Sequence, residues 1–412
     1  MTIDRVSNDM KSDHLQQENS APLSVESLII APEQSKQITT MHSRLEKECH
    51  IDSLPSFEVF DSRTKNTADI NGSQLTEQMY KNLFDGGFTN PHFYVSTENK
   101  RDIASCWDMG QVMESLTSSA QVFGDALDSG KLRQALNAMN KYFDKNSRPP
   151  GYDSGFGPQG DKYYDDNAWV GIACMDAYKY KKDPYWLDKA KRIFEFDEFG
   201  ARGTDKLAKP GGVFWTQQPD NLYRATVSTA GSAQLALQLY EVTQNKRHLE
   251  FARQQFDWVN QYLRTPAGLY KDGMDKDGKL HPEAYTYNQG LMLGDAAMLY
   301  KATKDPLYLK MAQDIAKTSL AAFDDNGSKI PGENPNPFSK QPLFFNAVFF
   351  KNLMLLDSIS PDASYRKALD DYANKVKSTV NADGLVTVEG RHTLLDQSSA
   401  IQVLELARTH PV

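Results

Sequence analysis

The chain of 412 residues lacks the features that mark several large classes of protein. It has three cysteines, Cys49, Cys106 and Cys174, and no CxxC pair. An odd, sparse set of this kind argues against a disulfide framework and against a structural zinc site. The eight histidines are scattered and no HExxH motif occurs. We therefore expect neither a metal site nor another cofactor.

Charge and hydropathy exclude further classes. The formal net charge is -8 at pH 7 and no block of lysine and arginine stands out, so neither nucleic acid nor an anionic membrane is expected as a partner. No apolar run approaches the length of a membrane span. Residues 1–17 are polar and lack the apolar core of a signal peptide. If Met1 is the native start, we expect a cytoplasmic protein; a secreted protein whose leader had been trimmed would look the same.

The composition changes along the chain. Residues 1–70 are mostly Ser, Asp, Glu, Gln, Lys and Thr with short apolar islands, which predicts an irregular, poorly ordered N-terminal extension. Residues 71–412 follow helical patterns and are long enough to bury a sizeable core. We expect this second part to be the functional domain, and to be a monomer.

An internal repeat organises the second part, with an aromatic residue, a leucine nine positions later and an alanine three positions after that. Successive copies lie roughly 55–62 residues apart. The clear copies are Tyr178, Leu187 and Ala190, then Tyr240, Leu249 and Ala252, then Tyr300, Leu309 and Ala312; weaker ones are Phe123, Leu132 and Ala135, and Leu356, Tyr365 and Ala368. Each copy joins an apolar helix to an amphipathic one, as expected when a buried helix pairs with an outer helix.

The helical patterns define six such pairs. Apolar inner helices are predicted at 104–123, 165–181, 224–243, 287–303, 344–357 and 393–408. Amphipathic outer helices are predicted at 130–145, 183–197, 246–264, 305–322 and 361–381, and a helix at 73–84 completes the set. This arrangement predicts an all-α protein, specifically an (α/α)6 toroid of six helical hairpins.

Unusual residues gather in the loops that lead into the predicted inner helices, and these loops meet at one end of such a toroid. Aromatic rings stack on the C–H faces of sugars, while carboxylates and amides bond to sugar hydroxyls. We therefore predict that this end binds carbohydrate. The candidate substrate contacts are Trp107, Tyr164, Trp215, Asp272, Tyr287, Asn288 and Gln289.

Asp165 and Asp166 stand side by side at the start of a predicted inner helix. Aspartate is favoured there simply because it caps the helix and suits the positive end of its dipole. Neighbouring residues at a helix start also diverge by about 100°, so their carboxyl groups can flank one bond. A retaining glycosidase needs such a pair about 5–5.5 Å apart, one as nucleophile and the other as acid and base.

Three motifs, in this order and spacing, resemble glycoside hydrolase family 76. They are Tyr164-Asp165-Asp166-Asn167-Ala168-Trp169, Gly211-Gly212-Val213-Phe214-Trp215 and Thr286-Tyr287-Asn288-Gln289-Gly290. The resemblance covers about residues 70–410 and implies an endo-α-1,6-mannanase on an (α/α)6 barrel, with mannan or manno-oligosaccharides as substrate. It also implies that Asp165 is the nucleophile, Asp166 the general acid/base and Asp272 a substrate contact.

The chain departs from that family at two places. Phe214 stands where the family has the first of two tryptophans, and Arg224 to Thr229 replace a Lys-Asn…Ser-Asn pattern. Both departures leave the subsite preference open.

Other functions share the predicted fold. A transglycosylase would pass the same covalent intermediate to a sugar instead of water. A catalytically silent carbohydrate-binding toroid would use the aspartates only as a helix cap. A sugar isomerase or epimerase would need histidines as acid and base, and only His281 and His392 lie near the rim loops.

Overall fold

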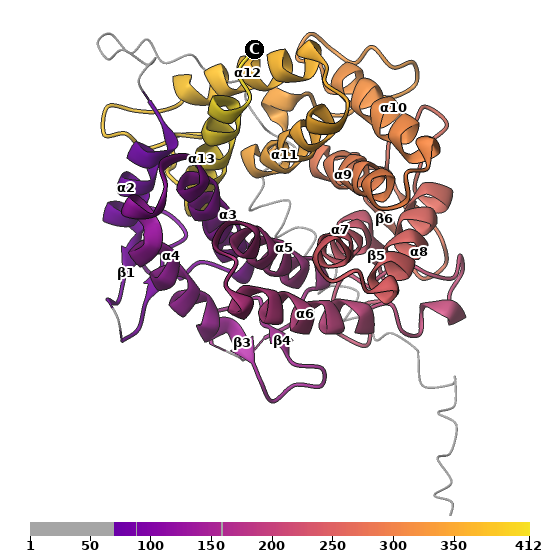
Figure 1. The fold of residues 1–412 in the computed structure, drawn as a ribbon, viewed down its shortest axis with the longest axis horizontal. Coiled ribbons are helices and arrows are strands. Elements are labelled where there is room, and N and C mark those ends of the chain that lie inside the picture. The colour runs from indigo at the N-terminus through magenta and orange to yellow at the C-terminus, as the bar shows by residue number, and fades with distance from the viewer. Residues whose placement is uncertain (1–69, 88, 158–159) are drawn as a thin grey trace, which may run out of the picture. The chain divides into compact units, whose positions relative to one another are not determined.

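The computed structural model describes residues 70–87, 89–157 and 160–412, and every statement below concerns these ranges. Apart from Ile70, the residues of the predicted N-terminal extension lie outside them. The described part of the chain consists mainly of α-helices, with a few strands of two residues each (Figure 1). No helix in these ranges has the length and apolar content that crossing a bilayer requires.

Six helices form an inner ring, which Figure 1 shows end-on. They are α3 (Cys106–Phe123), α5 (Tyr164–Lys181), α7 (Thr226–Thr243), α9 (Thr286–Thr303), α11 (Leu343–Ile359) and α13 (Leu394–Thr409). Each packs against the next, and α13 packs against α3 to close the ring. These helices are buried around most of their circumference, because neighbours cover both flanks and a partner covers the outside.

Six further helices form an outer layer. They are α2 (Gly72–Leu83), α4 (Asp125–Met139), α6 (Pro184–Phe199), α8 (Lys246–Tyr262), α10 (Pro306–Ala322) and α12 (Ala363–Ser378). Five follow an inner helix in sequence and pack on it, whereas α2 precedes the first inner helix and packs on α13, the last. The predicted all-α (α/α)6 toroid is confirmed.

One predicted helix is shifted. The pattern predicted 130–145, but α4 ends at Met139 and is followed by a 3-10 turn, Asn140–Tyr142. The chain then enters strand β3 (Phe143–Asp144), which pairs with β4 (Gly151–Tyr152). Because residues 143 and 144 pair with β4, they are extended and not helical. Helical periodicity in the sequence does not reveal such a tertiary contact.

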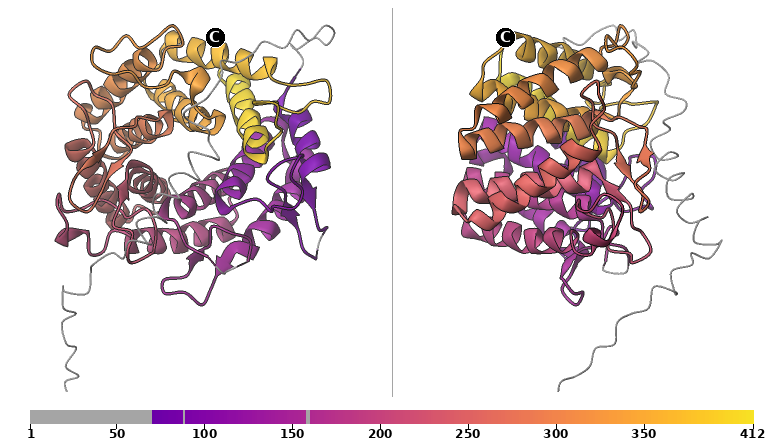
Figure 2. Two further views of the ribbon diagram at one scale, coloured as in Figure 1. Left: turned by 180° about the vertical axis from the view of Figure 1, so that it is seen from behind. Right: turned by 90° about the vertical axis from the view of Figure 1, so that its right-hand side faces the viewer.

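Tight turns join inner to outer helices by a repeated local design. Lys182 ends α5 in the left-handed conformation, and Asp183 then accepts a hydrogen bond from the N–H of Tyr185 to cap α6. The same turn recurs twice. Left-handed Gln244 precedes the cap Asn245 of α8, and left-handed Lys304 precedes the cap Asp305 of α10. The tight connections lie at one end of the ring, and in the side view of Figure 2 the longer connections gather at the other.

An extended ribbon runs through those longer connections. Tyr163 bridges Thr216, and Phe214 bridges Arg224. Strand β5 (Arg224–Ala225) pairs with β6 (Gly273–Met274), which pairs with β7 (Leu280–His281). A separate hairpin joins β1 (Phe84–Asp85) to β2 (His92–Phe93). The ribbon fixes the backbone that leads into α5 and α7, and therefore fixes the side chains carried there.

Candidate active site

The ribbon, rather than a side chain, starts the helix that carries the aspartate pair. Tyr163 occupies the N-cap position of α5 in an extended conformation and makes no side-chain cap. The N–H of Tyr164 instead donates to the carbonyl of Trp215 over 2.9 Å. Asp165 and Asp166 follow as the second and third residues of α5. Because the cap position belongs to Tyr163, the two aspartates are not N-cap residues.

Asp165 lies half-buried beside the indole of Trp215. Its Oδ2 accepts a hydrogen bond from Trp215 Nε1 over 3.2 Å. Its Oδ1 is buried and accepts no hydrogen bond from the described part of the protein. Burial raises the pKa of Asp165 to about 7, the indole N–H opposes this rise, and the charge of Asp272 adds to it. Near neutral pH this carboxyl group therefore exchanges its proton readily, and only one of its two oxygens is bonded to a side-chain donor.

Asp166 is more strongly desolvated. Its side chain is only 9% exposed. Burial, and next the negative charges of Asp165 and Asp108, raise its pKa well above the ordinary value. The two neighbouring groups thus differ in proton affinity, with Asp166 holding its proton more firmly. The helix start therefore carries two adjacent carboxyl groups of different proton affinity.

Asp272 adds a third carboxyl group, just before β6. Its Oδ2 accepts a hydrogen bond from the Tyr223 hydroxyl over 2.7 Å, and its Oδ1 accepts one from Asn288 Nδ2 over 3.2 Å. The Tyr287 hydroxyl lies 3.5 Å from the same Oδ1. Burial raises the pKa of Asp272, while the bonds from Tyr223 and Asn288 oppose that rise. These donors hold the carboxylate in one orientation.

Aromatic rings connect these groups around the open end of the ring. On one side Trp169 contacts Trp107 with ring centroids 5.3 Å apart, and Trp107 contacts Phe344 at 5.2 Å. Phe345 then stacks on Tyr287 at 3.9 Å with the planes 14° apart. These contacts belong to a continuous series of side chains, in the order Asp165, Trp215, Tyr223, Asp272, Tyr287, Phe345, Phe344, Trp107 and Trp169. Aromatic rings together with two carboxyl groups suit the mixed C–H and hydroxyl surface of a sugar.

Most of the predicted site residues are brought together here, but two are not. Tyr164 is 2% exposed and stacks on Phe196 of α6, with centroids 4.8 Å apart. Gln289 is fully buried, and its amide bonds to the backbone of Tyr270 and Tyr285. The structure therefore places Tyr164 and Gln289, both predicted as substrate contacts, in the core and away from the rim. Successive residues of a helix point about 100° apart. A motif at a helix start therefore places some side chains at the site and others in the core.

The Gln289 contact belongs to a recurring structural device. The fourth residue of α5, α9 and α13 is an amide that bonds both the N–H and the carbonyl of a loop residue. The pairs are Asn167 with Tyr152, Gln289 with Tyr270, and Gln397 with Val386. These amides anchor the long loops to the inner helices.

Sequence reasoning missed Tyr223, Phe344 and Phe345. The two phenylalanines lie in the first turn of α11, just as Trp107 and Tyr287 lie in the first turns of α3 and α9. An aromatic residue in the first turn of an inner helix was therefore the signal that could have found them. Tyr223 gives no such signal, since it approaches Asp272 only through the pairing of β5 with β6.

Comparisons with known proteins agree with this geometry. Residues 66–395 match the model of glycosyl hydrolase family 76. The chain is 27% identical over 214 residues to the mannan endo-1,6-alpha-mannosidase DCW1 of Saccharomyces cerevisiae, covering 48% of this chain and 47% of the relative. DFG5 of the same yeast, also named a mannan endo-1,6-alpha-mannosidase, is 35% identical over 155 residues, with 34% and 33% covered. The chain spans about half the length, or less, of these two curated relatives.

Solved structures share the fold. A family 76 glycoside hydrolase (mannosidase) of Bacteroides thetaiotaomicron superimposes with a TM-score of 0.73 at 20% identity, covering 84% of this chain and 98% of that one. An α-1,6-mannanase of Salegentibacter sp. HEL1_6 gives 0.67 at 21% identity, covering 82% and 98%. That structure is of an inactive variant, with two adjacent aspartates replaced by asparagine, in complex with α-1,6-mannotriose.

The expectation of a cytoplasmic protein was wrong. It depended on the absence of an apolar run near Met1, and such an absence does not identify a compartment. Both yeast relatives, DCW1 and DFG5, are named for action on mannan. Mannan is an extracellular polymer, so a cytoplasmic location is at odds with these relatives.

The family assignment thus agrees across the three kinds of observation. The sequence match extends over most of the chain, the toroid is the fold of solved members, and the rim carries the paired carboxyl groups that the motifs predicted. The predicted glycosidase family is confirmed, and the chain belongs to glycosyl hydrolase family 76.

Proposed function

We propose that residues 71–412 are the catalytic domain of a retaining glycosidase that hydrolyses α-1,6-mannosidic bonds in mannan or mannose-containing oligosaccharides. The observation that carries the proposal is the pair of adjacent carboxyl groups with unequal proton affinity at the aromatic end of the ring. The relatives named mannan endo-1,6-alpha-mannosidases support the choice of substrate, as does the mannanase bound to α-1,6-mannotriose.

In the first step Asp165 attacks C1 of a mannose residue. The indole N–H of Trp215 donates to Asp165 and stabilises its ionised form, as a nucleophile requires. Asp166 gives its proton to the departing glycosidic oxygen, so the C1–O bond breaks while a C1–aspartate ester forms. The higher proton affinity of Asp166 suits it to this role.

In the second step Asp166, now ionised, takes a proton from water as the water oxygen attacks C1. The ester to Asp165 breaks, and both carboxyl groups return to their starting states. Two successive inversions at C1 retain the α configuration. We assign hydrogen bonding of sugar hydroxyls to Asp272, whose carboxylate is oriented by the fully buried Asn288. We assign stacking on sugar rings to the aromatic side chains Trp107, Trp215 and Tyr287.

The test is hydrolysis of α-1,6-linked mannan and mannotetraose, with the first-formed product anomer followed by NMR. We expect α product from the wild type, and a loss of about 10²–10⁴-fold in kcat for both Asp165→Asn and Asp166→Asn. Asp188→Asn on the outer helix α6 is the control, because that side chain is 68% exposed. A β product would exclude retention, and full activity of either folded site variant would exclude its assigned role.

A further inference from the structure

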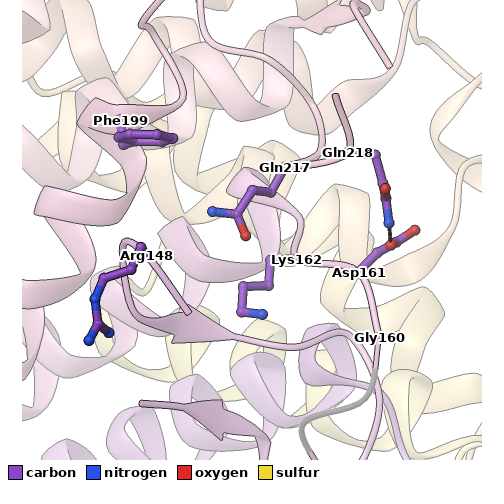
Figure 3. Close-up of a pocket in the computed structure, with 7 residues that line it drawn as sticks. All are labelled: Arg148, Gly160, Asp161, Lys162, Phe199, Gln217 and Gln218. Atoms are coloured by element: carbon purple, nitrogen blue, oxygen red, sulfur yellow. Dashed lines mark hydrogen bonds between the residues drawn. The ribbon is translucent and has the colours of Figure 1, made fainter. Parts of the chain in front are cut away.

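A second cavity opens beside the ribbon that leads into α5. It measures about 410 Å³ and is lined by Arg148, Gly160, Asp161, Lys162, Phe199, Gln217 and Gln218 (Figure 3). A volume of this size lies within the range of about 300–1,000 Å³ that is typical of small-molecule sites. We call it the lateral pocket.

The lateral pocket adjoins the candidate active site through the backbone. The N–H of Gln217 donates to the carbonyl of Lys162 over 2.8 Å, next to the bridge between Tyr163 and Thr216. Gln217 follows Trp215 by two residues, which places it about 7 Å further along the extended chain. A sugar chain that lies beside Trp215 and follows the ribbon toward Gln217 would extend in the direction of this pocket.

Charge in the lateral pocket argues against an anionic ligand. Lys162 is buried and its Nζ contacts Asp153 at 2.6 Å and Asp144 at 3.1 Å. With Asp161 also in the lining, three carboxyl groups accompany the two cations Lys162 and Arg148. The Arg202 guanidinium beside Phe199 adds a third cation. The charges therefore balance, and a neutral ligand fits better than a phosphate or carboxylate.

The remaining lining residues suit a neutral sugar. Phe199 supplies an aromatic ring, over which the Arg202 guanidinium lies at 4.9 Å, so the rest of the ring surface is what a ligand could contact. Figure 3 shows the Gln217 side chain between Phe199 and Lys162. Within the described ranges no hydrogen bond from this side-chain amide to other protein groups is found, and Gln218 Nε2 bonds to the carboxylate of Asp161. An aromatic surface with an unengaged amide offers one apolar and one polar contact, the combination that a sugar ring requires.

We propose that the lateral pocket is an additional sugar subsite, which binds a mannose residue of the substrate beyond those at the cleavage site. The inference rests on the proposed function. The bound residue belongs either to the α-1,6-linked main chain or to a branch, and both present the same hydroxyls and C–H faces.

Calorimetric titration of the Asp165→Asn/Asp166→Asn double variant separates binding from cleavage. The ligands are linear α-1,6-manno-oligosaccharides of increasing length and a branched manno-oligosaccharide. Adding Gln217→Ala or Phe199→Ala should raise Kd for the longest or the branched ligand by about five- to tenfold and leave Kd for the shortest unchanged. Gln313→Ala, a half-buried glutamine on α10, is the matched control and should change none of them.

The pattern of losses identifies the occupant. A loss confined to the branched ligand assigns the lateral pocket to a branch, and a loss with long linear ligands assigns it to the main chain. Unchanged Kd for every ligand in the folded Gln217→Ala variant overturns the inference. In that case hydrolysis of mannan by the wild type would still support the proposed function, whereas an inactive wild type that binds no ligand would overturn both.

Discussion

Asp165 and Asp166 are neighbours in sequence, yet their side chains meet different surroundings. Asp165 is half-buried and receives an indole N–H, whereas Asp166 is 9% exposed and senses the charge of Asp165. Burial disfavours the ionised form of both, and only Asp165 has a donor that offsets this cost. Two identical groups thereby acquire different proton affinities, as the proposed roles of acid and nucleophile require.

The buried acid should cost the protein stability at neutral pH. The pKa of Asp166 is raised in the folded state, so above about pH 4 the unfolded chain loses a proton that the folded chain keeps. Stability contributed by this group therefore falls as pH rises. Because asparagine cannot ionise, Asp166→Asn should be more stable at pH 7 by about 1 kcal/mol, or about 2 °C in Tm.

Calorimetry at two pH values checks this prediction. The gain in Tm at pH 7 should disappear near pH 3.5, where the unfolded aspartate is also protonated. Asp188→Asn, at an exposed position, should show no gain at either pH. A lower Tm for Asp166→Asn at pH 7 would contradict the expected burial cost.

Tyr223 should affect substrate binding through its hydrogen bond to Asp272. Its hydroxyl donates to Asp272 Oδ2 and favours the ionised carboxylate, so Tyr223→Phe should raise the pKa of Asp272 further. We expect KM for mannotetraose to rise about three- to tenfold with little change in kcat. The rise should be greatest at the acidic end of the pH profile, where more of Asp272 becomes protonated.

The matched control for Tyr223 is Tyr178→Phe, a half-buried tyrosine near the end of α5. It should leave both kinetic constants unchanged. An equal effect of the two variants, or a pure loss of kcat in Tyr223→Phe, would show that Tyr223 does not act through the binding carboxylate.

At the scale of elements, the loop before Trp215 depends on a close approach to α8. Gly212 has φ 79°, and a Cβ there would lie 2.9 Å from ring atoms of Trp258. Arg224, fully buried, donates to the carbonyls of Ala208, Lys209 and Gly211, and its guanidinium lies over the same Trp258 ring. These contacts fix the loop that carries Trp215 to Asp165.

Gly212→Ala should therefore disturb both stability and the site. Unfavourable φ and the clash with Trp258 together should lower the free energy of unfolding by about 2–4 kcal/mol. Displacement of the loop should also weaken the Trp215 bond to Asp165 and lower kcat. Urea unfolding and mannan hydrolysis measure the two effects.

Gly203 provides the control for Gly212. It has a similar φ of 83°, but nothing lies within 4 Å of the position of an added Cβ. Gly203→Ala should therefore show the backbone strain alone, about 1 kcal/mol, with normal activity. Equal losses in the two variants would mean that contact with Trp258 is unimportant.

At the scale of the whole molecule, charged side chains link helices across the inner ring. Lys351 of α11 forms ion pairs with Glu114 of α3 and Asp176 of α5. A small cavity inside the ring is lined by Lys351 and Glu114, together with Gln111, Trp169 and other residues. Burial and the charge of Asp176 raise the pKa of Glu114 to about 7, although Lys351 opposes this. The cluster joins segments far apart in sequence.

Lys351→Met should leave the buried carboxylate of Glu114 without its cation, and should leave Asp176 with only the longer pair to Lys179 at 3.9 Å. We expect the free energy of unfolding to fall by about 3 kcal/mol at pH 7. Without Lys351 both carboxyl groups should have raised pKa values in the folded state. The folded protein would then take up protons as pH falls, so the loss should shrink between pH 7 and pH 5.

Urea unfolding at the two pH values tests the Lys351 prediction. Lys310→Met is the control, because Lys310 is exposed and pairs with Asp314 one turn away on the surface, which contributes little. A loss in Lys351→Met that is equal at both pH values would rule out the proposed charge cluster as its cause.

The sequence by itself determined the helices and their layering, because a 3.6-residue pattern of apolar residues records which face each helix buries. It also located Asp165 and Asp166, since motif and helix start coincide. The tertiary structure alone decided which rim residues meet. Tyr164 and Gln289 turn into the core, while Tyr223 reaches Asp272 through strand pairing. Such contacts depend on side-chain direction and on chain segments far apart in sequence, which periodicity does not record.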